Sequence, residues 1–144
     1  ASAEMDRIFA ELTEGREIAP QTLTTQGRDL KIDRTARGVA RLFFEELCAR
    51  ALGASDYLTL TEHFHTLLLE NVPRLSPARR NEAKRFVTLI DILYEAKTNL
   101  VISAEVPAKD LYPEGDGSFE FARTVSRLME MRSEDYLKGR PQGT

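Results

Sequence analysis

The sequence has few cysteines, no long apolar run and no excess of one charge. Its single cysteine, Cys48, excludes an internal disulfide and fits a reducing compartment. Its uninterrupted apolar runs extend over only a few residues, so we predict that no segment spans a membrane. Twenty basic side chains face 23 acidic ones, a formal net charge of −3. This balance provides no basic field for nucleic acid, and we predict no nucleic-acid partner.

The usual motifs of several enzyme classes are also missing. There is no GxxxxGK[ST] loop and no GxGxxG motif, so the chain has no recognisable phosphate-binding loop of its own. His63 and His65 are the only histidines, and no cysteine or carboxylate stands at metal-ligand spacing beside them, so we predict no metal site. The sequence contains no GxSxG motif, so this signature of a serine hydrolase is missing.

What is present is the composition of one ordinary domain, with 144 residues of which 42% are hydrophobic. The clearest pattern runs from Phe64 to Pro107. Thr66–Glu70 and Leu100–Ala104 are short apolar runs, typical of strands buried on both faces of a parallel sheet. Between them, apolar residues recur at helical spacing and place Ile90 on the apolar face and Asp91 on the polar face. Ser76 as the cap and Pro77 at the first position predict where this helix begins.

The flanking segments complete an α/β pattern. We predict a short amphipathic helix over Ser2–Thr13, a hairpin turning at Gln26-Gly27, a strand over Gly38–Phe44 and a helix from Gly53 to Phe64. A loop is expected around Pro113 to Gly117, followed by a helix over Phe119–Arg132. The predicted class is α/β: a layered sheet with parallel strands joined by crossover helices, plus a small N-terminal helix and hairpin. We divide the chain into a lead-in (1–37), an α/β domain (38–137) and a tail (138–144).

Polar residues follow the two predicted parallel strands at the same edge of the sheet. Glu70 directly follows an apolar run, a position where α/β folds often hold a functional carboxylate. The simpler interpretation is a solvated strand end. The predicted rim of candidate functional residues is Glu70, Asn71, Ser103 and Glu105.

Arg123 and Arg127 lie four residues apart on one face of the last predicted helix. The simpler interpretation is that they form ion pairs with Glu120 and Glu130 at helical spacing, each contributing a few tenths of a kcal/mol. The functional interpretation is that one of them reaches phosphate groups bound elsewhere.

From about Gly38 to Leu137 the chain resembles the C-terminal half of the AFG-one-like, or ZapE-like, P-loop ATPases. The blocks that carry the resemblance are FFEELC (43–48), LGASDYLTL (52–60), FHT (64–66), VP (72–73), NEAKRFVTLIDILYE (81–95), LVISAEVP (100–107) and FEFARTVSRLMEMRSEDYL (119–137). Their order and spacing make the match specific. Two positions depart from the family pattern: Asn71 stands where relatives commonly have Asp, and Lys84 replaces an Arg.

The resemblance implies part of a P-loop NTPase fold without its P-loop, the Walker motifs being in the N-terminal half. It implies that ATP and Mg²⁺ bind to the full-length protein and that this chain alone is inactive. The implied partners are the N-terminal half, a homo-oligomeric ring and a client such as the tubulin-like division protein. The implied location is the cytoplasm, at the inner membrane or division site in bacteria, or the mitochondrion in a eukaryote. The alternative is a non-catalytic protein-binding α/β module that recognises a client or a subunit.

Overall fold

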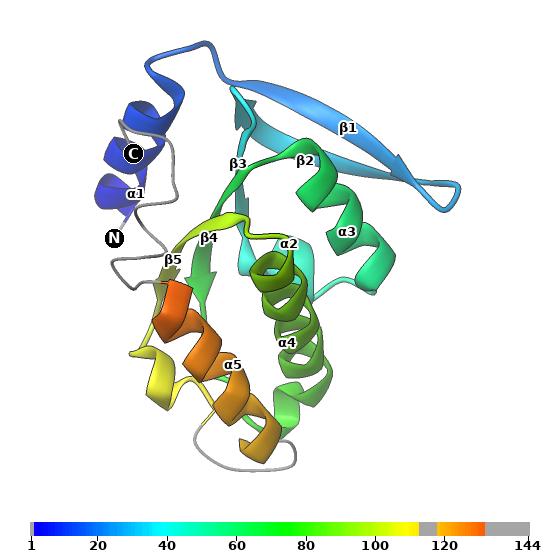
Figure 1. Ribbon diagram of the computed structural model, residues 1–144, viewed down its shortest axis with the longest axis vertical. Coiled ribbons are helices and arrows are strands. Elements are labelled where there is room, and N and C mark those ends of the chain that lie inside the picture. The colour runs from blue at the N-terminus through cyan, green and yellow to red at the C-terminus, as the bar shows by residue number, and fades with distance from the viewer. Residues whose placement is uncertain (1, 113–117, 132–144) are drawn as a thin grey trace.

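The computed structural model describes residues 2–112 and 118–131 (Figure 1). The predicted loop at 113–117 and the predicted tail at 138–144 lie outside the described residues. The elements in chain order are α1 (Ser2–Thr13), β1 (Ala19–Thr25), β2 (Arg28–Ala36), β3 (Val39–Phe43), α2 (Phe44–Cys48), α3 (Ala54–His63), β4 (Thr66–Val72), the 3₁₀ turn η1 (Pro77–Arg79), α4 (Arg80–Glu95), β5 (Asn99–Ala104), the 3₁₀ turn η2 (Ala108–Asp110) and α5 (Ser118–Met131).

The strands form one sheet in the order β1-β2-β3-β4-β5. The first three pair antiparallel, whereas β3, β4 and β5 run parallel. Parallel neighbours need long connections, which α2 and α3 provide between β3 and β4 and α4 provides between β4 and β5. The predicted α/β class, with parallel strands joined by helices, is confirmed. The proposed division between residues 37 and 38 falls in the turn between β2 and β3.

The predicted hairpin is confirmed and its turn chemistry explains it. Gln26 and Gly27 have φ values of 52° and 75°, and positive φ at both central positions is characteristic of a type I′ turn. This turn matches the twist of the two flanking strands, which pair from Thr25 and Arg28 outward.

The sheet has a hydrophobic layer on each face. On one face, the larger core packs β3 and β4 against α2, α3, α4 and α5. On the other, Met5, Phe9 and Leu12 of α1 pack against Val39 and Leu68. The predicted amphipathic helix over Ser2–Thr13 is therefore confirmed, and α1 lies on the opposite side of the sheet from α4 (Figure 1).

The predicted start of the helical segment is confirmed, with Ser76 as the cap residue and Pro77 at the first position, but the Ser76 side chain makes no capping hydrogen bond. Its carbonyl accepts from the Arg79 amide at 2.8 Å, so the chain first forms η1 and α4 begins at Arg80. This tighter i to i+3 pattern is common at helix starts. Burial on both faces holds for residues 66–70 of β4 but fails for β5, where four of the six residues are only half-buried. The reason is that β5 is an edge strand.

The apolar face of α4 offers a stability test. Ile90 is fully buried in the larger core, together with Phe86 and Leu93. We expect Ile90→Ala to lower the free energy of unfolding by about 2–5 kcal/mol, because it removes buried methyl groups and leaves a cavity. Lys84→Ala, on the exposed side of the same helix, is the matched control. Equal shifts of the denaturant midpoint in both variants would contradict the assigned helix face.

Candidate functional site

Glu70 occupies the end of β4, opposite Phe43 of β3, and is 2% exposed. Arg41 of β3 binds its carboxylate with two hydrogen bonds, Nε to Oε2 at 2.7 Å and Nη2 to Oε1 at 3.0 Å. Arg34 of β2 adds a third, from Nη2 to Oε2 at 2.9 Å. The expectation of a solvated strand end is therefore wrong, because the carboxylate is buried and held by two guanidinium groups.

The same cluster connects the sheet to α1. Arg41 also pairs with Asp6 of α1 at 2.7 Å, and its guanidinium lies 5.6 Å from the centre of the Phe9 ring. Arg34 stacks over the Phe43 ring at 4.8 Å. Two cations and two carboxylates thus balance, which is what allows charges to remain buried. We call Asp6, Arg34, Arg41 and Glu70 the charge cluster.

The charge cluster keeps Glu70 ionised. Burial by itself would raise the pKa of its carboxyl group, but the hydrogen bonds and charge of Arg41, with those of Arg34, outweigh this effect and hold the pKa below its ordinary value. Bonding to Glu70 is also the main cause that raises the pKa of the Arg41 guanidinium. An ionised carboxylate has about four acceptor sites, and guanidinium donors occupy three of those of Glu70. Glu70 is therefore suited to holding the structure rather than to transferring protons.

Of the other three rim residues, Asn71 and Ser103 are in contact at the ends of β4 and β5, whereas Glu105 contacts the backbone that follows Asn71. The Asn71 amide donates to the Ser103 hydroxyl at 3.0 Å, and the Arg74 amide donates to Glu105 Oε1 at 3.3 Å. Asn71 has a φ of 62°, where β4 carries an extra residue relative to β5. Asn tolerates this left-handed conformation better than most residues. The side chains of Ser103 and Glu105 therefore satisfy backbone amides at an irregular strand end.

Arg123 and Arg127 face α4 rather than glutamates of their own helix. Arg127 Nη1 donates to Asp91 Oδ1 at 2.5 Å, and Arg123 Nη2 donates to Asp91 Oδ2 at 3.2 Å. The expected pairing with Glu130 is wrong, since Glu130 accepts a hydrogen bond from the Tyr94 hydroxyl. The side chain of Glu120 lies outside the described residues.

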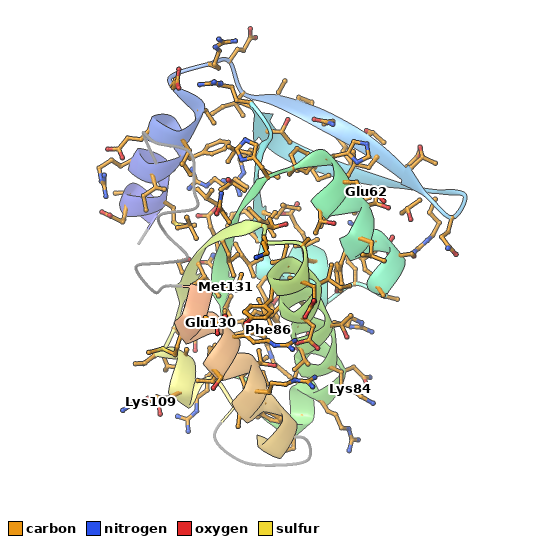
Figure 2. All side chains as sticks on the ribbon, in the orientation of Figure 1. Glu62, Lys84, Phe86, Lys109, Glu130 and Met131 are labelled. Atoms are coloured by element: carbon orange, nitrogen blue, oxygen red, sulfur yellow. The ribbon has the colours of Figure 1, made fainter. Side chains whose placement is uncertain are left out.

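The two arginines differ in how firmly they are held. The Arg127 side chain is 23% exposed, lies over the Tyr94 ring at 4.8 Å and approaches Glu95 at 4.0 Å. The Arg123 side chain is 62% exposed and, among the described side chains, pairs with Asp91. The helix that carries them is fixed by a stack between Phe86 and Phe121, 5.9 Å apart; Figure 2 shows Phe86 on the side of α4 that faces α5. Arg123 thus presents a charged group to solvent from a fixed helix.

A groove of about 810 Å³ runs along β5, and the sequence analysis did not predict it. Its walls come from α1 on one side and from α5 and the segment after β5 on the other. The sequence analysis also missed Arg34 and Arg41. A signal for Arg41 was available, because a charged residue interrupts the apolar run from Val39 to Phe44. Such a residue in a buried strand requires a buried partner.

Within the described residues, no helix is long and apolar enough to cross a membrane. Likewise, this part of the chain contains no group of three or more His, Cys, Asp and Glu side chains that could hold a metal ion.

The layered α/β fold and the order of motifs from Gly38 onward agree with a family assignment. The model of the AFG1-like ATPase family matches residues 1–140, and the chain belongs to this family. It is 38% identical over 136 residues to the cell division protein ZapE of Escherichia coli (strain K12), covering 94% of this chain and 36% of that protein. It is 32% identical over 170 residues to the lactation elevated protein 1 homolog B of Danio rerio, covering 94% of this chain and 34% of that protein. The chain thus spans about a third of the length of these relatives. No solved structure is significantly similar to it.

Proposed function

We propose that this chain is the C-terminal region of an AFG1-like ATPase and supports ATP-driven action on client proteins. The observation that carries this proposal is the family match over residues 1–140 in a chain that spans only 36% of ZapE and contains no GxxxxGK[ST] loop. A P-loop ATPase needs such a loop to hold the β and γ phosphates. In this proposal the loop belongs to the part of the protein outside the chain.

ATP and Mg²⁺ would accordingly bind to the P-loop part, and the residues described here fit only a supporting role toward them. Arg127 pairs with Asp91 and lies over the Tyr94 ring, whereas the Arg123 side chain is largely exposed. ATP supplies the phosphoryl group when bound; the contribution of this chain is a positive charge presented from a helix held against α4. We infer that Arg123 is the better candidate to contact a phosphate, and that Arg127 positions α5.

The Arg123 guanidinium would act across a subunit boundary. We propose that the full-length protein assembles into a homo-oligomeric ring. We propose a division protein of the tubulin-like kind as the client in a bacterium; a relative described as a cell division protein supports a role in division. The corresponding location is the cytoplasm, at the inner membrane or division site, and the mitochondrion for a eukaryotic member.

The alternative function is a non-catalytic module that recognises a client or subunit. The groove along β5 favours it, because a groove beside an edge strand is a common binding site for an extended peptide. The two functions differ in one measurable respect: a pure binding module would leave ATP turnover of the full-length protein unchanged when Arg123 is replaced.

The first test concerns the chain by itself. We expect residues 1–144 to show no ATP turnover above that of a buffer control, because positioning and charge neutralisation of the β and γ phosphates provide most of phosphoryl-transfer catalysis. The full-length protein should turn over ATP, and replacement of its P-loop lysine should abolish that activity. Turnover by the purified chain with Mg·ATP, unchanged by further purification, would refute the proposal.

A further inference from the structure

Within residues 2–112 and 118–131, the outer edge of β5 presents unpaired backbone groups. The Asn99 amide donates to the His65 carbonyl and the Glu105 amide donates to the Val72 carbonyl, both at 2.9 Å, so odd-numbered residues of β5 point their amides toward β4. Because successive residues of a strand alternate in direction, Leu100, Ile102 and Ala104 direct their backbone groups away from β4. Among the described residues, β4 is the only strand that pairs with β5.

The edge also lacks the features that usually protect an exposed strand. Natural edge strands carry charged residues, proline or a bulge that prevent pairing with another chain. β5 has the sequence NLVISA, with no charge and no proline, and the extra residue at the β4–β5 irregularity belongs to β4. The edge of β5 is therefore competent to pair with another strand.

Apolar side chains line both walls of the groove along this edge. Ile8 and Leu12 of α1 line one wall, beside the charged Arg7 and Glu11, and Leu128 and Met131 of α5 line the other. Figure 2 places Met131 at the end of α5 that lies beside β5. A strand laid along β5 would thus have one row of side chains against α1 and the other row against α5. Apolar side chains in both rows would find apolar partners, as they do in the central strands of parallel sheets.

We propose that this groove binds an extended apolar segment from the part of the AFG1-like protein outside this chain, which adds a strand to β5. The inference rests on the proposed function, in which about two thirds of the protein lies outside the chain, since 94% of the chain covers 36% of ZapE. An intact second copy fits less well, because helices flank the edge on both faces and leave room for a single strand. Residues 132–144 also fit poorly: Tyr136 and Leu137 are their only large apolar side chains, among charged residues, glycines and a proline.

Amide hydrogen exchange, measured on both the 1–144 chain and the full-length protein, tests this proposal. In the chain alone we expect the amides of Leu100, Ile102 and Ala104 to exchange rapidly while those of Val101 and Ser103, which face β4, are protected. In the full-length protein the outward amides should exchange at least about a hundredfold more slowly than in the chain. Protection already present in the chain alone would assign the groove to its own residues or to a second copy and would overturn the proposal.

A pair of variants separates groove binding from general stability. Ile8→Lys places a charge in the groove wall, whereas Leu58→Lys places one on α3, where Leu58 is 49% exposed. In the full-length protein, Ile8→Lys should reduce the protection of the outward amides at least about tenfold while the amides that face β4 stay protected, and Leu58→Lys should change neither. Rapid exchange of the outward amides in a full-length wild type that hydrolyses ATP would overturn the strand proposal and leave the proposed function standing. Loss of the proposed function would appear separately, as a full-length protein without ATP turnover.

Discussion

Replacing Arg123 by alanine should lower the kcat of the full-length ATPase by about a hundredfold or more, with little change in folding or ATP affinity. A guanidinium placed on the transferring phosphoryl group can account for about 10³ to 10⁵ in rate, whereas an exposed ion pair contributes under about 1 kcal/mol to stability. The Arg123 side chain is 62% exposed and, within the part of the chain that the structure describes, pairs with Asp91, so its removal costs the fold little. The charge matters more in the transition state than in the ground state, and kcat is therefore the quantity affected.

Arg127→Ala is the matched comparison on the same helix. It removes the ion pair with Asp91 and the stacking on Tyr94, so we expect a lower free energy of unfolding together with any change in activity. Mixing the Arg123→Ala protein with a P-loop lysine variant should restore part of the activity if the arginine acts across a subunit boundary. Wild-type kcat in both single arginine variants would mean that these side chains only hold α5 against α4.

Replacing Glu70 by glutamine should lower the free energy of unfolding by about 3–5 kcal/mol. The substitution keeps the shape of the side chain but leaves Arg41, whose side chain is 7% exposed, without its bidentate partner. The penalty comes mainly from a buried cation that loses its buried counter-charge, because the remaining ion-pair partner of Arg41, Asp6, is 69% exposed. Denaturant titration monitored by circular dichroism measures it. Glu62→Gln, on the exposed surface of α3, is the control and should have little effect.

The difference in stability between the wild type and Glu70→Gln should depend on pH. The folded-state pKa of Glu70 lies below its ordinary value of 4.5, so the ionised carboxylate stabilises the fold above that pH. This contribution is lost as the pH falls through the folded-state pKa. The stability difference between wild type and Glu70→Gln should thus be constant near neutral pH and become smaller below about pH 4.5. A difference that stays the same down to acid unfolding would show that the ionised form of Glu70 does not stabilise the charge cluster.

Local patterns in the sequence were sufficient for the class of fold and for most elements. Helical spacing of apolar residues predicted α1 and α4, and Gln26-Gly27 predicted the hairpin, because side-chain period and turn conformation depend on residues close in the chain. The order of the sequence blocks from Gly38 to Leu137 indicated the family for the same reason, since each block is a contiguous segment.

Tertiary structure alone decided which polar groups meet. Glu70 pairs with Arg41, 29 residues earlier, and Arg127 pairs with Asp91, 36 residues earlier. Periodicity indicates which face of an element a side chain occupies, but the partner depends on the order of strands and on the packing of helices across the sheet. Strand order also made β5 an edge strand, although its sequence resembles that of the buried β4. An apolar run indicates only that the side chains of a strand must be buried. The arrangement of the whole sheet determines which neighbouring elements bury them.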